Sequence, residues 1–225
     1  MSNGNRVVAI VAGAGSGRRM GADKTMLKLL DKPLIAWPVD VLQKNKSIDE
    51  IVVVLHKNNM AEGEKLVADH GWTKVKKICE GGELRQDSVR NGLSYAGECR
   101  WVLIQDGSRP FLTDRLIEEG LAAARETGAA IAAVPVKDTI KQSDGSECVT
   151  YTLDRSLLRM VQTPQVFRFE IIQQAYSEIK DEVTDDAALV ERAGLKVKMY
   201  TGDYNNIKVT TPEDLRLAEL IAGGR

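Results

Sequence analysis

The pattern of apolar and polar residues along this chain alternates between the period of a strand and that of a helix. Residues 6–12 form an apolar run rich in β-branched side chains, which predicts a parallel strand buried on both faces. Further strands are predicted at 50–55, 75–79, 101–105, 129–134, 196–200 and 207–209, and helices at 38–46, 60–70, 85–96, 113–127, 168–178, 185–193 and from 212 onward. This alternation predicts an α/β fold, a doubly wound and mostly parallel sheet in a single domain over residues 1–225.

The alternation breaks at residues 136–155. Two segments of strand character flank the turn residues Asp144 and Gly145, which predicts a β-hairpin with a type I′-like turn. Its strands alternate imperfectly and offer little apolar surface to a core, so we expect it to project from the domain. The residues alone leave open whether this arm packs on another subunit or is a surface hairpin without a partner.

Composition and charge narrow the classes of function. The net charge is −1, so nothing global favours a nucleic-acid or membrane partner, and anion binding must come from local clusters. The apolar run near the N-terminus is too short for a signal-peptide core or a membrane span, so a cytoplasmic protein is expected. The three cysteines show no CxxC spacing and are expected to be free thiols in a reducing compartment.

The turn after the first predicted strand is rich in glycine. Glycines let a backbone approach a ligand closely and point N–H groups at phosphate. The spacing fits neither the dinucleotide fingerprint nor the Walker A loop, because Arg18 stands where each requires a glycine. Instead the loop carries the cations Arg18, Arg19, Lys24 and Lys28. They suit a triphosphate, although a solvated basic loop is the alternative interpretation.

A carboxylate follows the predicted strand at 101–105. Ligands of open α/β sheets bind beyond the carboxyl ends of the strands, so Asp106 is expected to face whatever the glycine loop binds. There it could hold Mg²⁺ that bridges phosphate oxygens, and Arg109 would face an anion. A turn-forming Asp before glycine and a surface ion pair are the alternatives.

Eight short motifs occur in order along the chain. They lie at 12–20 with Lys24, 81–89, 106–111, 135–141, 154–155, 162–167, 184–191 and 206–215. With these motifs the chain resembles the 2-C-methyl-D-erythritol 4-phosphate cytidylyltransferases over about residues 6–220. This family has the Rossmann-like fold of the nucleoside-diphosphate-sugar pyrophosphorylases.

The resemblance implies transfer of CMP from CTP to a sugar-alcohol phosphate, with release of pyrophosphate and with Mg²⁺ held on the nucleotide by Asp106. It implies a homodimer in which the arm at 136–155 reaches the other subunit, so that Thr139 and Arg155 clamp the acceptor phosphate in trans. The implied catalytic residues are Arg19, Lys24 and Lys208; the nucleotide-binding residues are Ala14, Gly15, Gly82, Glu83, Arg85, Ser88 and Asp106; the acceptor-binding residues are Arg109, Thr139, Arg155, Thr163 and Thr184.

Two other functions remain open. A ribitol-5-phosphate cytidylyltransferase would share the fold and the nucleotide but use another acceptor. A non-catalytic nucleotide-binding regulator would be expected to lack Lys24, Asp106 or Lys208, and this chain has all three. By local propensity, Thr163 and Thr184 also suit turns or caps, and Lys208 and Ser88 suit solvated surface positions.

Overall fold

A seven-stranded sheet forms the centre of the computed structural model, which describes residues 5–15, 25–179 and 181–224. The strand order is β11-β7-β10-β6-β1-β4-β5, and every neighbouring pair is parallel except those that β10 makes with β6 and β7. The strands are β1 (Val7–Gly13), β4 (Glu50–Leu55), β5 (Val75–Glu80), β6 (Trp101–Asp106), β7 (Ala129–Pro135), β10 (Arg159–Arg168) and β11 (Lys198–Thr201).

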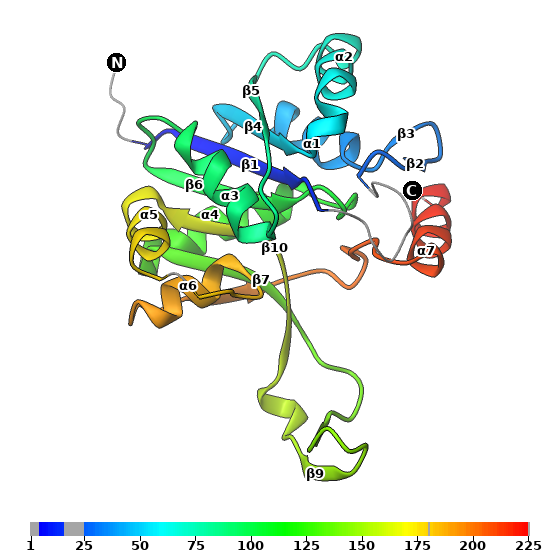
Figure 1. Cartoon of the computed structure of the whole chain (residues 1–225), viewed down its shortest axis with the longest axis vertical. Coiled ribbons are helices and arrows are strands. Elements are labelled where there is room, and N and C mark those ends of the chain that lie inside the picture. The colour runs from blue at the N-terminus through cyan, green and yellow to red at the C-terminus, as the bar shows by residue number, and fades with distance from the viewer. Residues whose placement is uncertain (1–4, 16–24, 180, 225) are drawn as a thin grey trace.

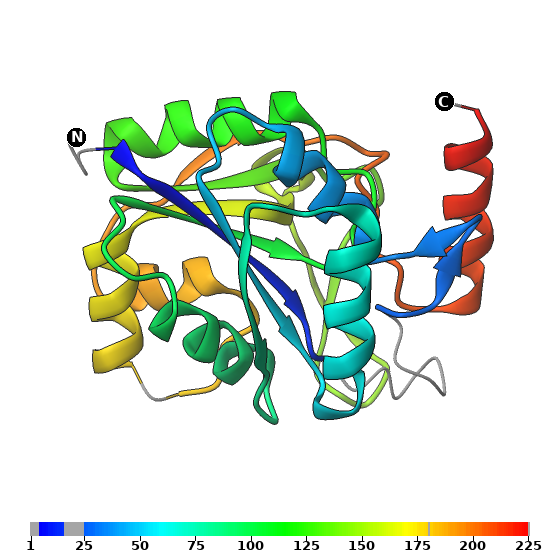
Figure 2. The ribbon, with the colours of Figure 1, turned by 90° about the horizontal axis from the view of Figure 1, so that it is seen from above.

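Helices cover both faces of the sheet, as the predicted doubly wound α/β fold requires (Figure 2). One face packs against α1 (Ala36–Lys44), α2 (Met60–His70) and α4 (Asp114–Thr127). The other packs against α3 (Arg85–Ser94), α5 (Phe169–Glu178) and α6 (Asp186–Arg192). The residues of β1 are divided between the two apolar clusters, which explains its uninterrupted apolar sequence.

The chain reverses its direction of travel across the sheet beside β1. From β1 it moves outward through β4 to the edge strand β5, and it then returns to β6 on the other side of β1. Ala12, near the end of β1, lies opposite Asp106 at the end of β6. The first residues of the glycine loop and Asp106 therefore meet at the point where such sheets bind their ligands.

A smaller unit packs beside the carboxyl end of β1. It contains the short hairpin of β2 (Lys28–Leu29) and β3 (Lys32–Pro33), which the sequence pattern did not predict, and the C-terminal helix α7 (Pro212–Gly223) (Figure 1). Thr211 caps α7 through the N–H of Asp214. An apolar cluster of Leu29, Leu34, Phe111, Val209 and Ala218 joins these elements to the domain.

The secondary structure after the arm differs from the prediction in two segments. The strand β10 was missed, because its polar residues Gln162, Thr163 and Gln165 interrupt the apolar pattern although all three are buried. The strand predicted at 207–209 is absent, and this segment is instead an irregular connection in which the Val209 N–H donates to the Ser108 carbonyl.

The predicted arm projects far from the sheet (Figure 1). It carries β8 (Lys141–Ser143), β9 (Val149–Thr152) and the short 3₁₀ helix η3 (Arg155–Leu157), so its ladder is shorter than the predicted hairpin. Both strands are exposed at every residue. A second 3₁₀ turn, η2 (Lys57–Asn59), precedes α2.

Two smaller expectations concern membranes and cysteines. Among the described residues, none of the helices has the length and hydropathy needed to cross a bilayer. The three cysteines are free thiols, as the sequence predicted.

Candidate active site

Asp106 is a buried carboxylate surrounded by three cations. It is 5% exposed at the end of β6. Its Oδ1 accepts a hydrogen bond from Arg85 Nε at 3.1 Å, and its Oδ2 lies 2.7 Å from Lys208 Nζ. Arg109 Nε is 3.7 Å from the same Oδ2. Residues from three distant segments of the chain therefore converge on one carboxylate.

These cations keep Asp106 ionised. Burial by itself raises the pKa of this carboxyl, but Arg85, Lys208 and Arg109 outweigh burial and hold the pKa far below its usual range. Asp106 is consequently a fixed negative charge at neutral pH. The cluster still carries more positive than negative charge around Asp106, which suits a polyanionic ligand.

A hollow of about 130 Å³ lies on the glycine-loop side of this cluster. Thr25 fixes its rim, because the Thr25 hydroxyl donates to the Gly13 carbonyl at 2.9 Å. The predicted nucleotide-binding residues that line the hollow are Ala14, Gly15, Arg85, Ser88 and Asp106, and Lys208 lines it as well.

The loop between β5 and α3 packs tightly against the glycine loop. A Cβ added at Gly81 would lie 2.2 Å from the Ala14 Cβ, so only glycine permits this approach. Ser88 is 3% exposed, and its hydroxyl accepts from the Gly82 N–H and donates to the Leu84 carbonyl. Ser88 thus shapes the loop that carries Gly82 and Glu83. These two predicted nucleotide-binding residues do not line the hollow.

A larger hollow, of about 440 Å³, lies on the other side of Asp106. It falls within the size range of small-molecule sites. The predicted acceptor-binding residues Arg109, Thr163 and Thr184 line it. Arg85, Asp106 and Lys208 line both hollows, so these three residues form the wall between them.

Arg109 and Thr163 also hold the site together. The Thr163 hydroxyl accepts from the Asp106 N–H at 3.1 Å, and the Thr163 carbonyl accepts from the Asn206 amide at 2.7 Å. Arg109 donates to the Asn206 carbonyl at 2.7 Å. These bonds place the segment that carries Lys208 against β6 and β10.

The remaining predicted residues do not join this cluster within one chain. Thr139 and Arg155 are exposed on the arm and line neither hollow. Lys28 is exposed on β2 and also lines neither hollow. Arg18, Arg19 and Lys24 lie outside the described residues.

Sequence reasoning missed several residues of the site. The larger hollow is also lined by Gln162, Gln165, Asp185 and Glu191. Asp186 lines neither hollow and contacts Arg85. Asp185 caps α6, whereas Asp186 is fully buried. The adjacent aspartates at 185 and 186 were the available signal, since a cap needs only one of them.

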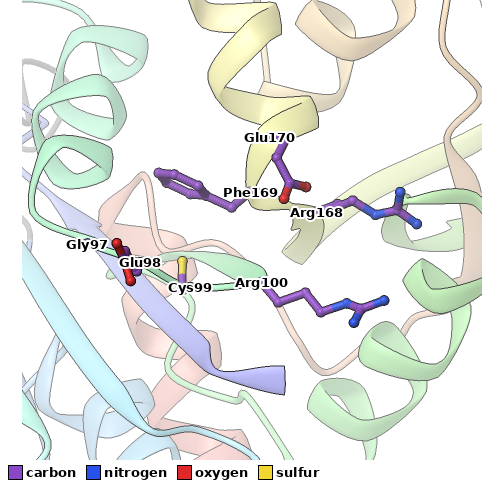
Figure 3. Close-up of a pocket in the computed structure, with 7 residues that line it drawn as sticks. All are labelled: Gly97, Glu98, Cys99, Arg100, Arg168, Phe169 and Glu170. Atoms are coloured by element: carbon purple, nitrogen blue, oxygen red, sulfur yellow. The ribbon is translucent and has the colours of Figure 1, made fainter. Parts of the chain in front are cut away.

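Another hollow, of about 520 Å³, lies at the opposite end of the sheet, where β6 begins and β10 ends (Figure 3). Figure 3 shows Arg100 and Arg168 extending side by side, with Glu170 and Phe169 nearby. Two glutamates, Glu98 and Glu170, offset the two arginines in its lining. Because it holds none of the predicted site residues and lies at the end of the sheet away from Asp106, we place the site at Asp106.

The residues around Asp106 fit a magnesium ion that arrives with a nucleotide. The described residues contain no group of three or more His, Cys, Asp or Glu side chains that could hold a metal. Mg²⁺ in nucleotide sites commonly takes one or two carboxylates and fills the rest of its shell with phosphate oxygens and water. Asp106 provides one such carboxylate at the junction of the two hollows.

Comparison with known proteins identifies the family. The chain matches the family model of 2-C-methyl-D-erythritol 4-phosphate cytidylyltransferase (IspD) over residues 7–223. The chain belongs to this family. The enzyme of that name from Dehalococcoides mccartyi is 48% identical over 217 residues, which cover 96% of each chain. The one from Clostridium perfringens is 42% identical over 95% of this chain and 97% of the relative.

Solved structures of the same family have the same architecture. The 4-diphosphocytidyl-2C-methyl-D-erythritol synthase of Anaerococcus prevotii superimposes with a TM-score of 0.87 at 30% identity, covering 98% of this chain and 97% of that one. The cytidylyltransferase of Thermus thermophilus gives a TM-score of 0.79 at 30% identity, covering 97% and 99%. The fold of this cytidylyltransferase family member thus agrees with the predicted α/β class.

Proposed function

We propose that this chain transfers CMP from CTP to 2-C-methyl-D-erythritol 4-phosphate, releasing pyrophosphate and forming 4-diphosphocytidyl-2-C-methyl-D-erythritol. One observation carries the proposal: Asp106 and its three cations stand between two hollows at the switch point of the sheet. Membership of the cytidylyltransferase family supports the choice of substrates.

The chemistry requires positioning and charge rather than a nucleophilic side chain. A phosphate oxygen of the acceptor attacks the α-phosphorus of CTP, and a new P–O bond forms. The bond from this phosphorus to the β-phosphate oxygen breaks, and its electron pair leaves with pyrophosphate. Cations fixed around the α-phosphate stabilise the added negative charge of the transition state.

Lys208 is suited to such a role because it can exchange partners. Its side chain is 34% exposed, whereas that of Asp106 is 8% exposed. The carboxylate is therefore fixed, while the ammonium group can turn from Asp106 toward a phosphate that enters either hollow. Arg109 is held more firmly, through two carbonyls in addition to Asp106, and offers a fixed charge on the acceptor side.

Mg²⁺ would be held by Asp106 together with oxygens of the triphosphate. When bound, the ion would offset the charge of the leaving pyrophosphate. Lys208 would have to release Oδ2 of Asp106 for this binding, since the two cations compete for one oxygen.

We infer that the arm forms a homodimer. Its two strands have no core of their own, and a two-stranded hairpin alone is marginally stable. The exposed fractions of its apolar side chains are large: 61% for Val149, 60% for Tyr151 and 78% for Leu157. A second copy would cover them and bring Thr139 and Arg155 to the larger hollow of its partner.

An acceptor panel tests the reaction. The purified chain is incubated with CTP, Mg²⁺ and either 2-C-methyl-D-erythritol 4-phosphate or ribitol 5-phosphate, and pyrophosphate is measured. We expect release with the methylerythritol substrate and much slower release with ribitol 5-phosphate. Faster release with ribitol 5-phosphate would identify that compound as the acceptor. CTP binding without pyrophosphate release would contradict the proposed catalytic activity.

A further inference from the structure

A second carboxylate contacts the wall between the two hollows but lines neither hollow. Asp186, the first residue of α6, is 0% exposed. Its Oδ2 lies 2.7 Å from Arg85 Nη2, and its Oδ1 accepts a hydrogen bond from the Tyr176 hydroxyl at 2.6 Å. Arg85 is thus held between two aspartates, with Asp186 on one side and Asp106 on the other.

The charges in this row alternate. Tyr176 donates to Asp186, Asp186 pairs with Arg85, Arg85 pairs with Asp106, and Asp106 pairs with Lys208. Burial lowers the pKa of Arg85, but the two aspartates outweigh burial and raise it well above its usual range. Burial and the neighbouring Asp186 raise the pKa of Tyr176, so its hydroxyl remains a donor.

Asp186 helps to fix the position of the Arg85 guanidinium relative to Asp106. The two carboxylates attract different ends of one guanidinium, since Asp106 contacts Nε and Asp186 contacts Nη2. If Asp186 were neutral, Arg85 would be attracted to Asp106 alone and would lose the contact that fixes its Nη2 end.

We propose that Asp186 is a positioning residue that holds Arg85 on the wall between the two hollows, where Arg85 faces both bound substrates. Tyr176 supports Asp186 in this role. The inference rests on the proposed transfer reaction for its kinetic consequence, but the placement of Arg85 is a property of the protein without substrate.

A double-mutant cycle tests the proposal. Asp186→Asn keeps the size of the side chain and removes its charge, and we expect kcat/KM for CTP to fall about tenfold, as for loss of one charge-assisted hydrogen bond. In an Arg85→Gln background the same change is expected to have little further effect. Equal losses in both backgrounds would overturn the proposal, because Asp186 would then act independently of Arg85.

A second measurement does not depend on activity. In the ligand-free wild type, the Nε–H group of Arg85 should give a sharp NMR signal protected from solvent exchange, assigned by its loss in Arg85→Gln. We expect that signal to broaden in Asp186→Asn and to change less in Tyr176→Phe. An unchanged Arg85 signal in Asp186→Asn would overturn the proposal, whether or not the wild type has transfer activity. If the signal changes but the wild type is inactive, only the proposed reaction is rejected.

A matched control separates position from stability. Asp40 is a half-buried carboxylate on α1 that pairs with Lys32 and accepts from Trp72 Nε1 at 2.8 Å. It lies on the opposite face of the sheet from α3, which carries Arg85. Asp40→Asn should lower the thermal midpoint without altering kcat/KM or the Arg85 signal. If Asp186→Asn does not fold, Tyr176→Phe takes its place in the cycle, and additive effects there would overturn the proposal.

Discussion

Lys208 Nζ lies 2.7 Å from Oδ2 of Asp106, although Lys208 stands near the C-terminus and Asp106 ends the strand β6. This contact joins the irregular connection before α7 to the centre of the sheet. The charge cluster at the candidate site depends on it, so it is the first contact to test.

Lys208→Ala should lower kcat by about 30- to 1000-fold, which corresponds to about 2–4 kcal/mol for one donor to a charged transition state. The physical reason is the loss of a cation that can turn toward the phosphates. Steady-state pyrophosphate release measures the effect. Lys198→Ala is the control, since Lys198 forms an exposed ion pair with Glu126 and is expected to keep wild-type turnover. A Lys208→Ala variant with near wild-type turnover would reject the catalytic role.

Asp106→Asn should lower the free energy of unfolding at pH 7 by about 3 kcal/mol, the low end for a broken buried ion pair, because Arg85 and Lys208 are partly exposed. The pKa of Asp106 is depressed in the folded state, so its contribution is fully present above the unfolded pKa of about 4. It is lost as pH falls below that value toward the folded pKa.

Chemical denaturation at several pH values measures this dependence. The difference between wild type and Asp106→Asn should be constant from neutral pH down to about 5 and should shrink below about 4. A difference that grows on acidification would contradict the assignment of Asp106 as an ionised group in the folded protein.

Gly81→Ala should weaken CTP binding, because the added Cβ would lie 2.2 Å from the Ala14 Cβ and 2.6 Å from the Ser88 hydroxyl. Overpacking of this kind costs about 1–3 kcal/mol, and here it would displace the loops that frame the smaller hollow. Calorimetric titration with CTP measures the affinity. Gly223→Ala is the matched control, since nothing lies within 4 Å of a Cβ added there. Equal affinity for CTP in both variants would contradict the assignment of the smaller hollow to the nucleotide site.

Arg155→Ala should raise KM for the acceptor more than KM for CTP, because Arg155 would reach the acceptor hollow of the partner subunit. The arrangement in trans has a sharper test. Mixing Arg155→Ala with Lys208→Ala under exchange of subunits should restore part of the activity, since a mixed dimer would contain one site with both residues intact. No restoration in a mixture shown to contain mixed dimers would contradict sharing of the site.

The sequence predicted the regular part of the fold well. β4 and α2 have the predicted bounds, and Thr113 caps α4 as expected, because strong apolar periodicity and a clear cap act locally. β10 was missed because buried polar side chains such as Gln165 are satisfied by distant partners, here Asp185 and the Ala187 N–H. Local sequence contains no sign of such partners.

The same reason limited prediction of the candidate site. Asp106 and the glycine loop were placed together by the rule for strand ends, and Lys208 by the resemblance to the family. Asp186 was not singled out from the sequence, and only the tertiary structure, which gathers α3, α5 and α6 on one face of the sheet, reveals its contact with Arg85. Long-range pairing of charges is a property of the tertiary fold and leaves no period in the sequence.

The root of the arm has a consequence for how the chain can vary. Arg159 of β10 pairs with Pro135 of β7, so the chain leaves the sheet and re-enters it at adjacent positions. Residues 136–158 therefore form a closed excursion whose length does not set the register of either strand. Replacing the excursion by a short turn should yield a monomeric body with an unaltered sheet, and grafting a longer one should change which surface of a neighbour it can reach.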